Sequence, residues 1–329
     1  MSVTINIALS LLSQIMVADS TPNKTHFRFE HDRISAATGE LSLSIPFISD
    51  FDLCPNFFEF AAIIGKTKDA YSVTVTDSRM KIKAGRATGS VDCIDGAVIH
   101  YCPRYAEKMW VECDLQLFFE AAKIARVVSS ANAANVFEAA LLAGDKSLIG
   151  TNRNVVIEAY HGLPLQEKLA IPLEFFDKVQ RISNLLKLQP CFVGYDDRTF
   201  SIKYENGVTF STQLYDASQF PDMENILAEW LAATEFLPLP SELIDGLQTF
   251  IKFNEKETNA IIIDNFIANE AKTFAYGMSD ELSETTLKIK AETWLKFLPY
   301  CDTVSALENN RVICLSGKNM RVIASKLRV

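Results

Sequence analysis

The chain has 329 residues, of which 48% are hydrophobic and 22% charged, with only 13 glycines and 11 prolines. This composition excludes a disordered, collagen-like or low-complexity chain, and at roughly 100–200 residues per domain it predicts two or three domains. The formal net charge of −9 disfavours binding to nucleic acid through bulk positive charge, although it permits a local basic surface.

The chain opens with a predicted amphipathic helix over residues 3–17. This stretch has several polar side chains and no basic start, which favours a helix over a signal peptide. No later run approaches the roughly 20 apolar residues that a membrane span needs. The seven cysteines form no CxxC pair, and the four histidines show no zinc-ligand spacing. We therefore expect a cytoplasmic protein with no metal site, disulfide framework or membrane contact.

Three segments of the chain then read alike, which indicates an internal repeat. Helices with one apolar face are predicted over 3–17, 114–130 and 241–252. A second helix in each repeat begins at positions 55, 172 and 291, at steps of 117 and 119 residues. Pro55 and Pro172 are predicted to stand at the first helical position.

Each repeat also ends in two alternating stretches around a polar turn, which is typical of a β-hairpin. The predicted hairpins join Tyr71–Thr76 to Met80–Ala84, Cys191–Tyr195 to Phe200–Tyr204, and Val312–Leu315 to Met320–Ala324. We predict an α+β fold of three repeated domains, each with two helices on one face of an antiparallel sheet. The boundaries are expected near 106 and 229, giving domains 1–106, 107–229 and 230–329.

Basic residues recur along the polar sides of these helices, although the first helix has none. They are Lys66, Lys123, Arg126, Lys178, Arg181, Lys187, Lys252 and Lys296. One interpretation is that these residues only form the solvent-exposed faces of their helices. The alternative is a shared surface of cations that meets phosphate groups.

No catalytic pattern accompanies these features. Gly65-Lys66-Thr67 mimics the end of a phosphate-binding loop, but position 60 is Phe where that motif needs Gly. Neither GxSxG nor a strand-linked GxGxxG occurs. We expect no cofactor and no enzymatic activity. Two functions stay open at this point: an interaction scaffold or single-stranded nucleic-acid-binding protein built from the same repeated domain, and an enzyme with a site assembled from scattered carboxylates.

The middle repeat carries a family resemblance. Residues 148–156 read Leu-Ile-Gly-Thr-Asn-Arg-Asn-Val-Val, followed by Leu-Ala-Ile-Pro at 169–172 and Phe-Pro-Asp-Met at 220–223. These segments resemble the bacterial DNA polymerase sliding clamp, most closely over 136–228. The sequence departs from the family where Asp-Gly-His-Arg becomes Asn-Arg-Asn-Val at 152–155. It is therefore identified as a divergent clamp, for which an origin in a bacteriophage is open.

The resemblance implies a ring of two head-to-tail chains and six domains, with helices lining a channel for double-stranded DNA. The eight basic residues would contact phosphates irrespective of base sequence. The expected partners are a replicative DNA polymerase and an ATP-driven clamp loader. Phe250 and Ile251 are expected to supply apolar contacts at the seam of the homodimer.

The resemblance also implies an apolar cleft between the second and third domains where partner peptides bind. Its expected walls come from a turn in the middle repeat, the end of that repeat and the C-terminal tail. They are Thr151, Arg153, Asn154, Val155, Ile226, Leu227, Leu327, Arg328 and Val329. The alternative is that Ile226 and Leu227 only fasten the two domains together.

Overall fold

The computed structural model describes residues 3–65, 71–76, 78–84, 86–96, 103–105, 109–163, 165–231, 236–254, 258–271, 273–279, 283–306 and 312–325. These residues form two compact units. The first unit comprises residues 1–116 and 174–214, and the second comprises 117–173 and 215–329. Each unit is built around one large antiparallel sheet.

The large sheet of the first unit has seven strands. Its order is β1 (Arg28–Glu30), β2 (Arg33–Ala37), β3 (Leu41–Pro46), β15 (Thr209–Gln213), β14 (Thr199–Tyr204), β13 (Pro190–Tyr195) and β8 (Val111–Glu112). The central joint pairs β3 with β15, so that Leu43 lies opposite Phe210. Both side chains are fully buried, and this long-range pairing holds the two parts of the unit together.

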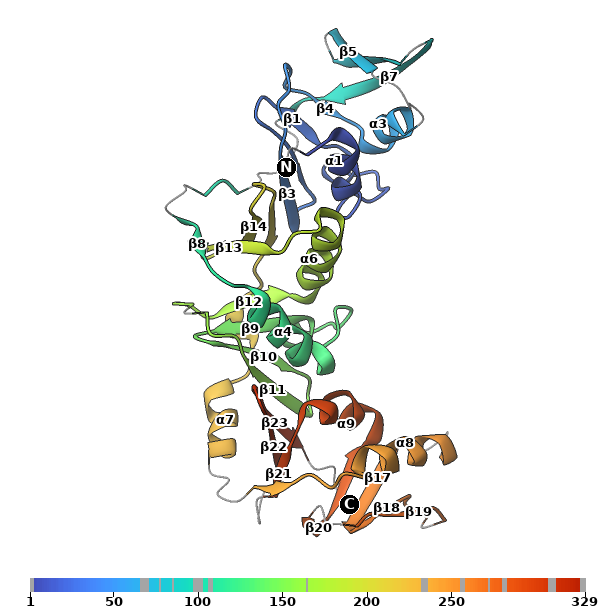
Figure 1. The fold of residues 1–329 in the computed structure, drawn as a ribbon, viewed down its shortest axis with the longest axis vertical. Helices are drawn as coiled ribbons and strands as arrows, with labels where there is room; N and C mark the ends of the chain where they lie inside the picture. Colours follow the sequence, from blue (N-terminus) through green and yellow to red (C-terminus); the bar gives the residue numbers. More distant parts are fainter. Residues whose placement is uncertain are drawn as a thin grey trace. The chain divides into compact units, whose positions relative to one another are not determined.

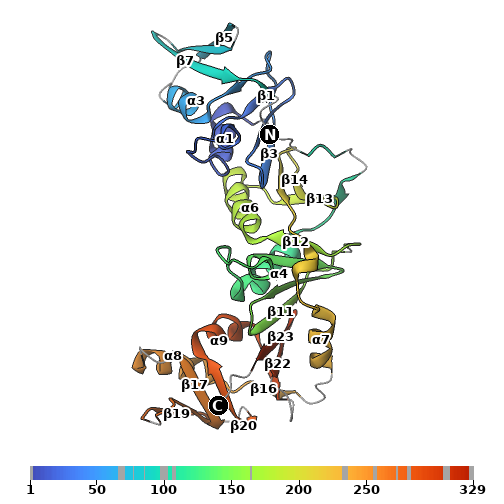
Figure 2. The same ribbon diagram turned by 180° about the vertical axis from the view of Figure 1, so that it is seen from behind.

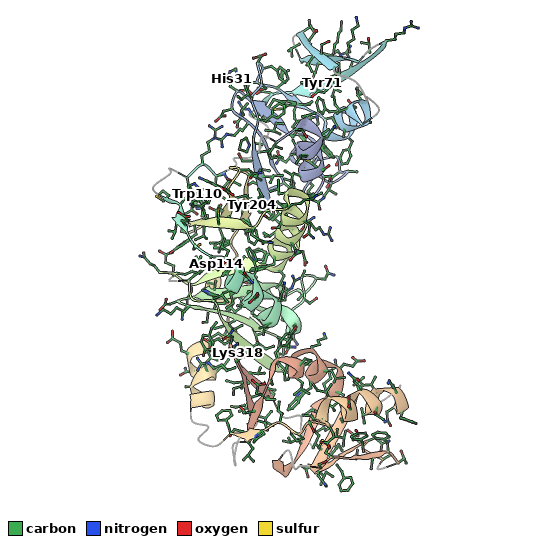
Figure 3. All side chains as sticks on the ribbon, viewed as in Figure 1. His31, Tyr71, Trp110, Asp114, Tyr204 and Lys318 are labelled. Atoms are coloured by element: carbon green, nitrogen blue, oxygen red, sulfur yellow. The ribbon has the colours of Figure 1, made fainter. Side chains whose placement is uncertain are left out.

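Three helices cover one face of this sheet: α1 (Ile5–Leu12), α3 (Phe57–Ile64) and α6 (Leu173–Leu186) (Figures 1 and 2). Apolar residues alternate along the strands and meet the helices, and Phe175 of α6 stacks on Phe210 with ring centroids 5.2 Å apart. Tyr204 is also buried on this side, where its hydroxyl group shares a 3.0 Å hydrogen bond with Ser183 of α6 (Figure 3).

A smaller sheet completes the first unit, in the order β4 (Cys54–Pro55), β7 (Ala87–Ile94), β6 (Arg79–Ala84) and β5 (Tyr71–Thr76). Strand β4 meets β7 only through Cys54 and Pro55. Among the described residues, no strand pairs with the remaining outer edge of β7 over residues 87–92. A one-turn helix, α2 (Pro22–Thr25), lies between α1 and β1 in the sequence.

The large sheet of the second unit has eight strands. Its order is β12 (Leu169–Pro172), β9 (Ala140–Gly144), β10 (Ser147–Thr151), β11 (Val155–Tyr160), β23 (Met320–Ser325), β22 (Val312–Gly317), β21 (Thr303–Ala306) and β16 (Leu237–Pro238). Its central joint pairs β11 with β23, so that buried Ile157 lies opposite buried Val322. Glu158 and Arg321 form an ion pair across the same joint, and Glu158 is 5% exposed.

Helices lie on both sides of this sheet (Figures 1 and 2). On one side are α4 (Gln116–Ala125), the 3-10 helix η3 (Arg126–Val128) and α9 (Ala291–Phe297), and α8 (Leu243–Phe253) packs between α9 and strands β18 and β19 of a second sheet. On the other side is α7 (Met223–Leu231). The short elements α5 (Val136–Ala139), η4 (Ala217–Gln219) and η5 (Leu298–Tyr300) fill connections. A second sheet has the order β19 (Ala275–Gly277), β18 (Phe266–Ala268), β17 (Asn259–Asp264) and β20 (Ser283–Lys290).

The same strand pattern recurs three times. Strands β1–β2–β3, β9–β10–β11 and β17–β18–β19 form successive antiparallel ladders, and the third strand of the first two ladders pairs with a later hairpin strand. Strand β19 is the third strand of the last ladder, and within the described residues its outer edge has no partner strand. The α+β class, the repeat and all three hairpins are therefore confirmed.

The predicted helix starts need correction. Pro55 lies in β4 and Pro172 ends β12 opposite Ala140, so neither occupies the first turn of a helix. Helix α3 instead begins after Asn56, whose Oδ1 accepts the N–H groups of Phe58 and Glu59. The division at 106 and 229 stays a prediction. Residue 106 is outside the described residues, and 229 falls within α7.

The close approach of α4 to β10 gives a first testable prediction. A Cβ added to Gly150 would lie 1.8 Å from the carbonyl oxygen of Ala125, so the backbone of one element must move. We expect Gly150→Ala to reduce the free energy of unfolding by about 2 kcal/mol, measured by thermal or denaturant unfolding. Gly144→Ala is the matched control, because a Cβ there meets nothing within 4 Å. Equal stability of the two variants would contradict this packing.

Candidate functional site

The predicted basic residues of the second unit lie on its helical side. Lys123 of α4, Lys252 of α8 and Lys296 of α9 are exposed, and Arg126 of η3 is half-buried. Helix α9 contacts both α8 and η3, and η3 directly follows α4, so the four cations lie on adjoining helices of the unit. Lys66 lies outside the described residues.

The basic residues of the first unit differ in what they contact. Lys178 donates a 2.6 Å hydrogen bond from its Nζ atom to the carbonyl oxygen of Gln14 and lies 3.5 Å from a carboxylate oxygen of Glu174. Arg181, one turn later on α6, is exposed. Lys187 follows α6 with a φ of 55°, a left-handed conformation common where a helix ends. Thus Lys178 fastens two segments of the unit, whereas Arg181 and Lys187 project into solvent.

The predicted partner-binding turn is held by short-range hydrogen bonds. The Asn152 side-chain oxygen accepts the N–H groups of Asn154 and Val155, each at 2.8 Å. The buried hydroxyl group of Thr151 donates to the carbonyl oxygen of Val155 at 2.9 Å. Val155 is buried as well, so among these residues the turn presents the exposed side chains of Arg153 and Asn154.

Arg153 extends from this turn with its side chain 76% exposed and lies 3.4 Å from a carboxylate oxygen of Glu138. The backbone N–H of Ser325 donates to the carbonyl oxygen of Asn154 at 2.7 Å. Ser325, the last described residue, therefore lies beside the turn. Leu327, Arg328 and Val329 themselves lie outside the described residues.

An apolar cluster adjoins the turn within the second unit. Its buried members are Ala140, Leu142, Ile149, Val156, Ala170, Phe220 and Met223. Ile226 and Leu227 of α7 are partly buried and pack against it. Val136, Phe137 and Tyr215 also pack on this cluster, although their place there was not predicted from the sequence. The one-turn helix and the loop that carry them give no periodic signal, so only the fold reveals their position.

The residues expected at the seam lie on α8, but their exposure differs from the expectation. Phe250 is fully buried and its ring contacts Phe274 at 5.8 Å between centroids. Its side chain therefore offers no surface to a partner, while Ile251 is half-buried. Phe253 of the same helix is 74% exposed and stacks on Phe274. Among the described residues of α8, Phe253 has the large apolar side chain that is exposed.

Two of the described cysteines have thiols that burial makes less acidic. Burial raises the pKa of Cys54 and of Cys301 to about 12, which keeps both thiols protonated near neutral pH. Burial lowers the pKa of His161, whose Nδ1 atom accepts the N–H of Leu163. Within the described part of the chain no group of three or more His, Cys, Asp or Glu residues could hold a metal ion, and no helix could span a membrane.

No protein-family model matches the chain, and no curated protein matches it in sequence. Solved structures do match it. The Helicobacter pylori beta clamp bound to a DNA ligase peptide is 16% identical, with a TM-score of 0.75 over 98% of each chain. A putative DNA polymerase III beta subunit from Eubacterium rectale is 11% identical, with a TM-score of 0.75 over 99% of this chain and 97% of that one.

The beta subunit of DNA polymerase III from Thermotoga maritima gives a TM-score of 0.71 at 12% identity, over 99% of this chain and 97% of that one. These matches extend over nearly the whole of each chain, so they include the order of all three repeats. The protein therefore has the fold of the bacterial DNA polymerase III beta clamps, in a sequence that diverges widely from them.

The different contacts of Lys178 and Arg181 give a prediction about stability. Lys178→Met removes a charged donor from the carbonyl group of Gln14 and should reduce the free energy of unfolding by about 1 kcal/mol. Arg181→Met on the exposed side of the same helix should change it by less than about 0.5 kcal/mol. Denaturant unfolding of both variants measures the difference. If the two variants lose the same stability, Lys178 does not fasten α6 to the segment after α1.

Proposed function

We propose that this protein is a DNA sliding clamp, a processivity factor that encircles double-stranded DNA and tethers a replicative polymerase. The observation that carries the proposal is the fold match with bacterial beta clamps over 98–99% of the chain. The basic residues on the helical layers support it, because Lys and Arg side chains there would meet phosphate groups.

A sliding function suits this distribution of charge. Exposed Lys123, Arg181, Lys187, Lys252 and Lys296 are long, mobile side chains that neutralise phosphates without reading bases. Tight base-specific contacts would stop movement along DNA. The net charge of −9 weakens binding of DNA to the remaining surface. In this proposal the protein needs no cofactor of its own, and a separate ATP-driven loader opens the ring in the cytoplasm.

The repeated strand pattern suggests how two chains would close the ring. Within the chain, β3 pairs with β15 and β11 pairs with β23. The third joint of this series would pair β19 of one chain with β7 of a second chain, since both have open edges among the described residues. Two chains with three domains each, divided near 106 and 229, would make six domains. Phe253 and half-buried Ile251 on α8 are our candidates for apolar seam contacts.

The apolar cluster beside the turn at residues 151–155 is the proposed docking site for partner peptides. The structure of the H. pylori beta clamp holds a bound DNA ligase peptide, which supports a peptide site in the present fold. Here Ile226 and Leu227 would bury apolar anchors, and Arg153 would meet an acidic residue or the peptide backbone. Leu327, Arg328 and Val329 would complete the site. No specific observation favours a catalytic function or a scaffold that closes no ring.

Topological retention on DNA tests the proposal. A ring threaded onto linear duplex should remain bound at high salt when both DNA ends are blocked, and should leave when one end is opened. A phosphate-binding protein that does not encircle DNA should dissociate from both substrates, because salt weakens its contacts. Retention that does not depend on blocked ends would contradict encirclement.

The DNA contacts can be tested on the same substrate. Neutralising Lys123, Arg126, Arg181 and Lys187 together should weaken initial binding in a salt-dependent manner, lowering the slope of log affinity against log salt by about 3–4. Retention on end-blocked DNA should persist once the ring is threaded. Lys168→Met is the control, because this exposed lysine lies beside Glu224 and away from the proposed contacts. An unchanged slope would show that these four residues do not contact DNA phosphates.

Partner binding should depend on the tail and on α7. Removing residues 327–329, or replacing Leu227 with Ser, should reduce affinity for the cognate polymerase at least tenfold if these residues are hot spots. Leu237→Ser is the control, because Leu237 is exposed on β16 and lies outside the apolar cluster. Surface plasmon resonance provides the measurement. Parental affinity in both test variants would place the partner site elsewhere.

A further inference from the structure

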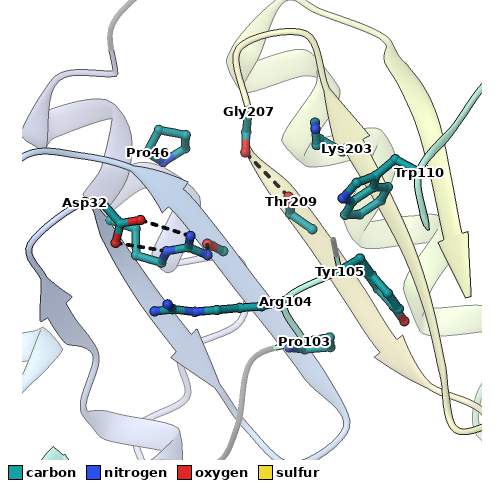
Figure 4. Close-up of a pocket in the computed structure, with 11 residues that line it drawn as sticks. Asp32, Pro46, Pro103, Arg104, Tyr105, Trp110, Lys203, Gly207 and Thr209 are labelled. Carbon is teal, nitrogen blue, oxygen red and sulfur yellow. Dashed lines mark hydrogen bonds and ion pairs between the residues drawn. The ribbon is translucent and has the colours of Figure 1, made fainter. Parts of the chain in front are cut away.

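A pocket of about 260 Å³ lies on the other face of the first unit's large sheet. The strand register explains its floor. Ser44 of β3 and Lys203 of β14 both lie opposite Thr209 of β15, so their side chains share one face of the sheet. The neighbouring residue Phe210 points to the opposite face and stacks on α6. The pocket therefore lies on the side away from α6 (Figure 4).

The wall of this pocket comes from the segment that leads into β8. It includes Pro103, Arg104, Tyr105 and Trp110. Tyr105 and Trp110 make an edge-to-face contact with centroids 5.2 Å apart. Gly194 of β13 allows this pair to lie against the sheet, since a Cβ there would be only 3.2 Å from the Trp110 ring. The Tyr105 hydroxyl group also hydrogen-bonds with Thr199, so the aromatic wall is held in place.

The polar groups of the pocket are mainly hydrogen-bond donors. Arg104 donates to Glu30 at 2.6 Å, and Arg33 lies 3.1 Å from Asp32 and 3.6 Å from Glu30. Lys203 differs, because in the described residues no carboxylate forms an ion pair with it. Its Nζ atom lies 5.3 Å from the ring centroid of Trp110 and 4.9 Å from that of Phe192.

These contacts prepare the pocket for one negative group. Glu30 and Asp32 hold the two guanidinium groups in place, which reduces the cost of ordering them when a ligand binds. The Lys203 ammonium group lies close to the open space. The Ser44 hydroxyl group accepts from Arg33 at 3.2 Å and keeps its own proton to donate, whereas the Thr209 hydroxyl group donates to the carbonyl oxygen of Gly207 at 3.5 Å (Figure 4). An oxyanion at Lys203 would gain charge-assisted hydrogen bonds from its ammonium group and from the Ser44 hydroxyl group. Pro46, Pro103 and Trp110 add apolar walls beside this polar centre.

We propose that this pocket binds an acidic peptide segment of a partner protein, with one carboxylate at Lys203 and an adjacent apolar side chain against Trp110. The volume suits one or two side chains. A nucleic acid is disfavoured, because its flanking phosphates would meet the Asp32 carboxylate, whose side chain is 65% exposed at the pocket. The pocket does not depend on ring closure, and none of its residues belongs to the proposed clamp contacts with DNA or partner peptide.

Fluorine NMR of the full chain with 5-fluorotryptophan at its three tryptophans tests the pocket. The probe is N-acetyl-Glu-Phe-amide. Its carboxylate should change the environment of Trp110 through Lys203, so the Trp110 signal, assigned with Trp110→Phe, should shift in a saturable manner. The signals of Trp230 and Trp294 should stay in place. Lys203→Met should weaken binding about tenfold, while Lys168→Met should not.

Three further outcomes decide the ligand class. N-acetyl-Gln-Phe-amide should bind at least about tenfold more weakly, because it lacks the charge. An equal shift with this neutral peptide would overturn the proposal, as would no shift of Trp110 with the acidic one. A thymidine tetranucleotide that shifts Trp110 at lower concentration than the peptide would assign the pocket to nucleic acid instead. Unchanged Trp230 and Trp294 signals in Lys203→Met verify that the variant is folded.

Discussion

The pairing of strands from distant parts of the chain is the constraint on which the structure depends. Leu43 meets Phe210 in the first unit, and Ile157 meets Val322 in the second. All four side chains are buried, so a shift of one residue in either register would turn apolar side chains to the opposite face. These joints place the helices on their sheets, and the second joint brings Ser325 to the turn at Asn154. The candidate surfaces therefore exist only when both joints form.

The two proposed functions use different parts of the surface that these strand pairings create. The helical layers carry the exposed cations proposed to meet DNA, while α7 and the turn at residues 151–155 form the proposed partner site on another part of the second unit. Lys178 shows that a basic residue on a helix need not serve DNA, because its ammonium group binds a backbone carbonyl inside its own unit. Local contacts, rather than charge alone, decide what each cation can do.

The sequence was sufficient for the elements with regular periodicity. Alternating residues around polar turns identified the three hairpins, and apolar stripes identified the main helices. The sequence was insufficient where tertiary contacts determine which side chains are buried. Phe250 and Phe253 lie on one helix, and only packing against Phe274 shows that the first is buried and the second exposed. Pro172 resembles a helix start but ends an edge strand. The pocket around Lys203 was not predicted, because its residues come from separate strands and a connecting segment.

In the proposed ring, the strand joint seen twice within each chain recurs at both seams between the two chains. Electron microscopy of the purified protein, combined with a mass from light scattering, tests whether two chains close in this way. We expect a mass of twice 36.7 kDa and closed particles with a central hole and six similar segments. A monomer at high concentration, or a dimer whose images show no central hole, would contradict it.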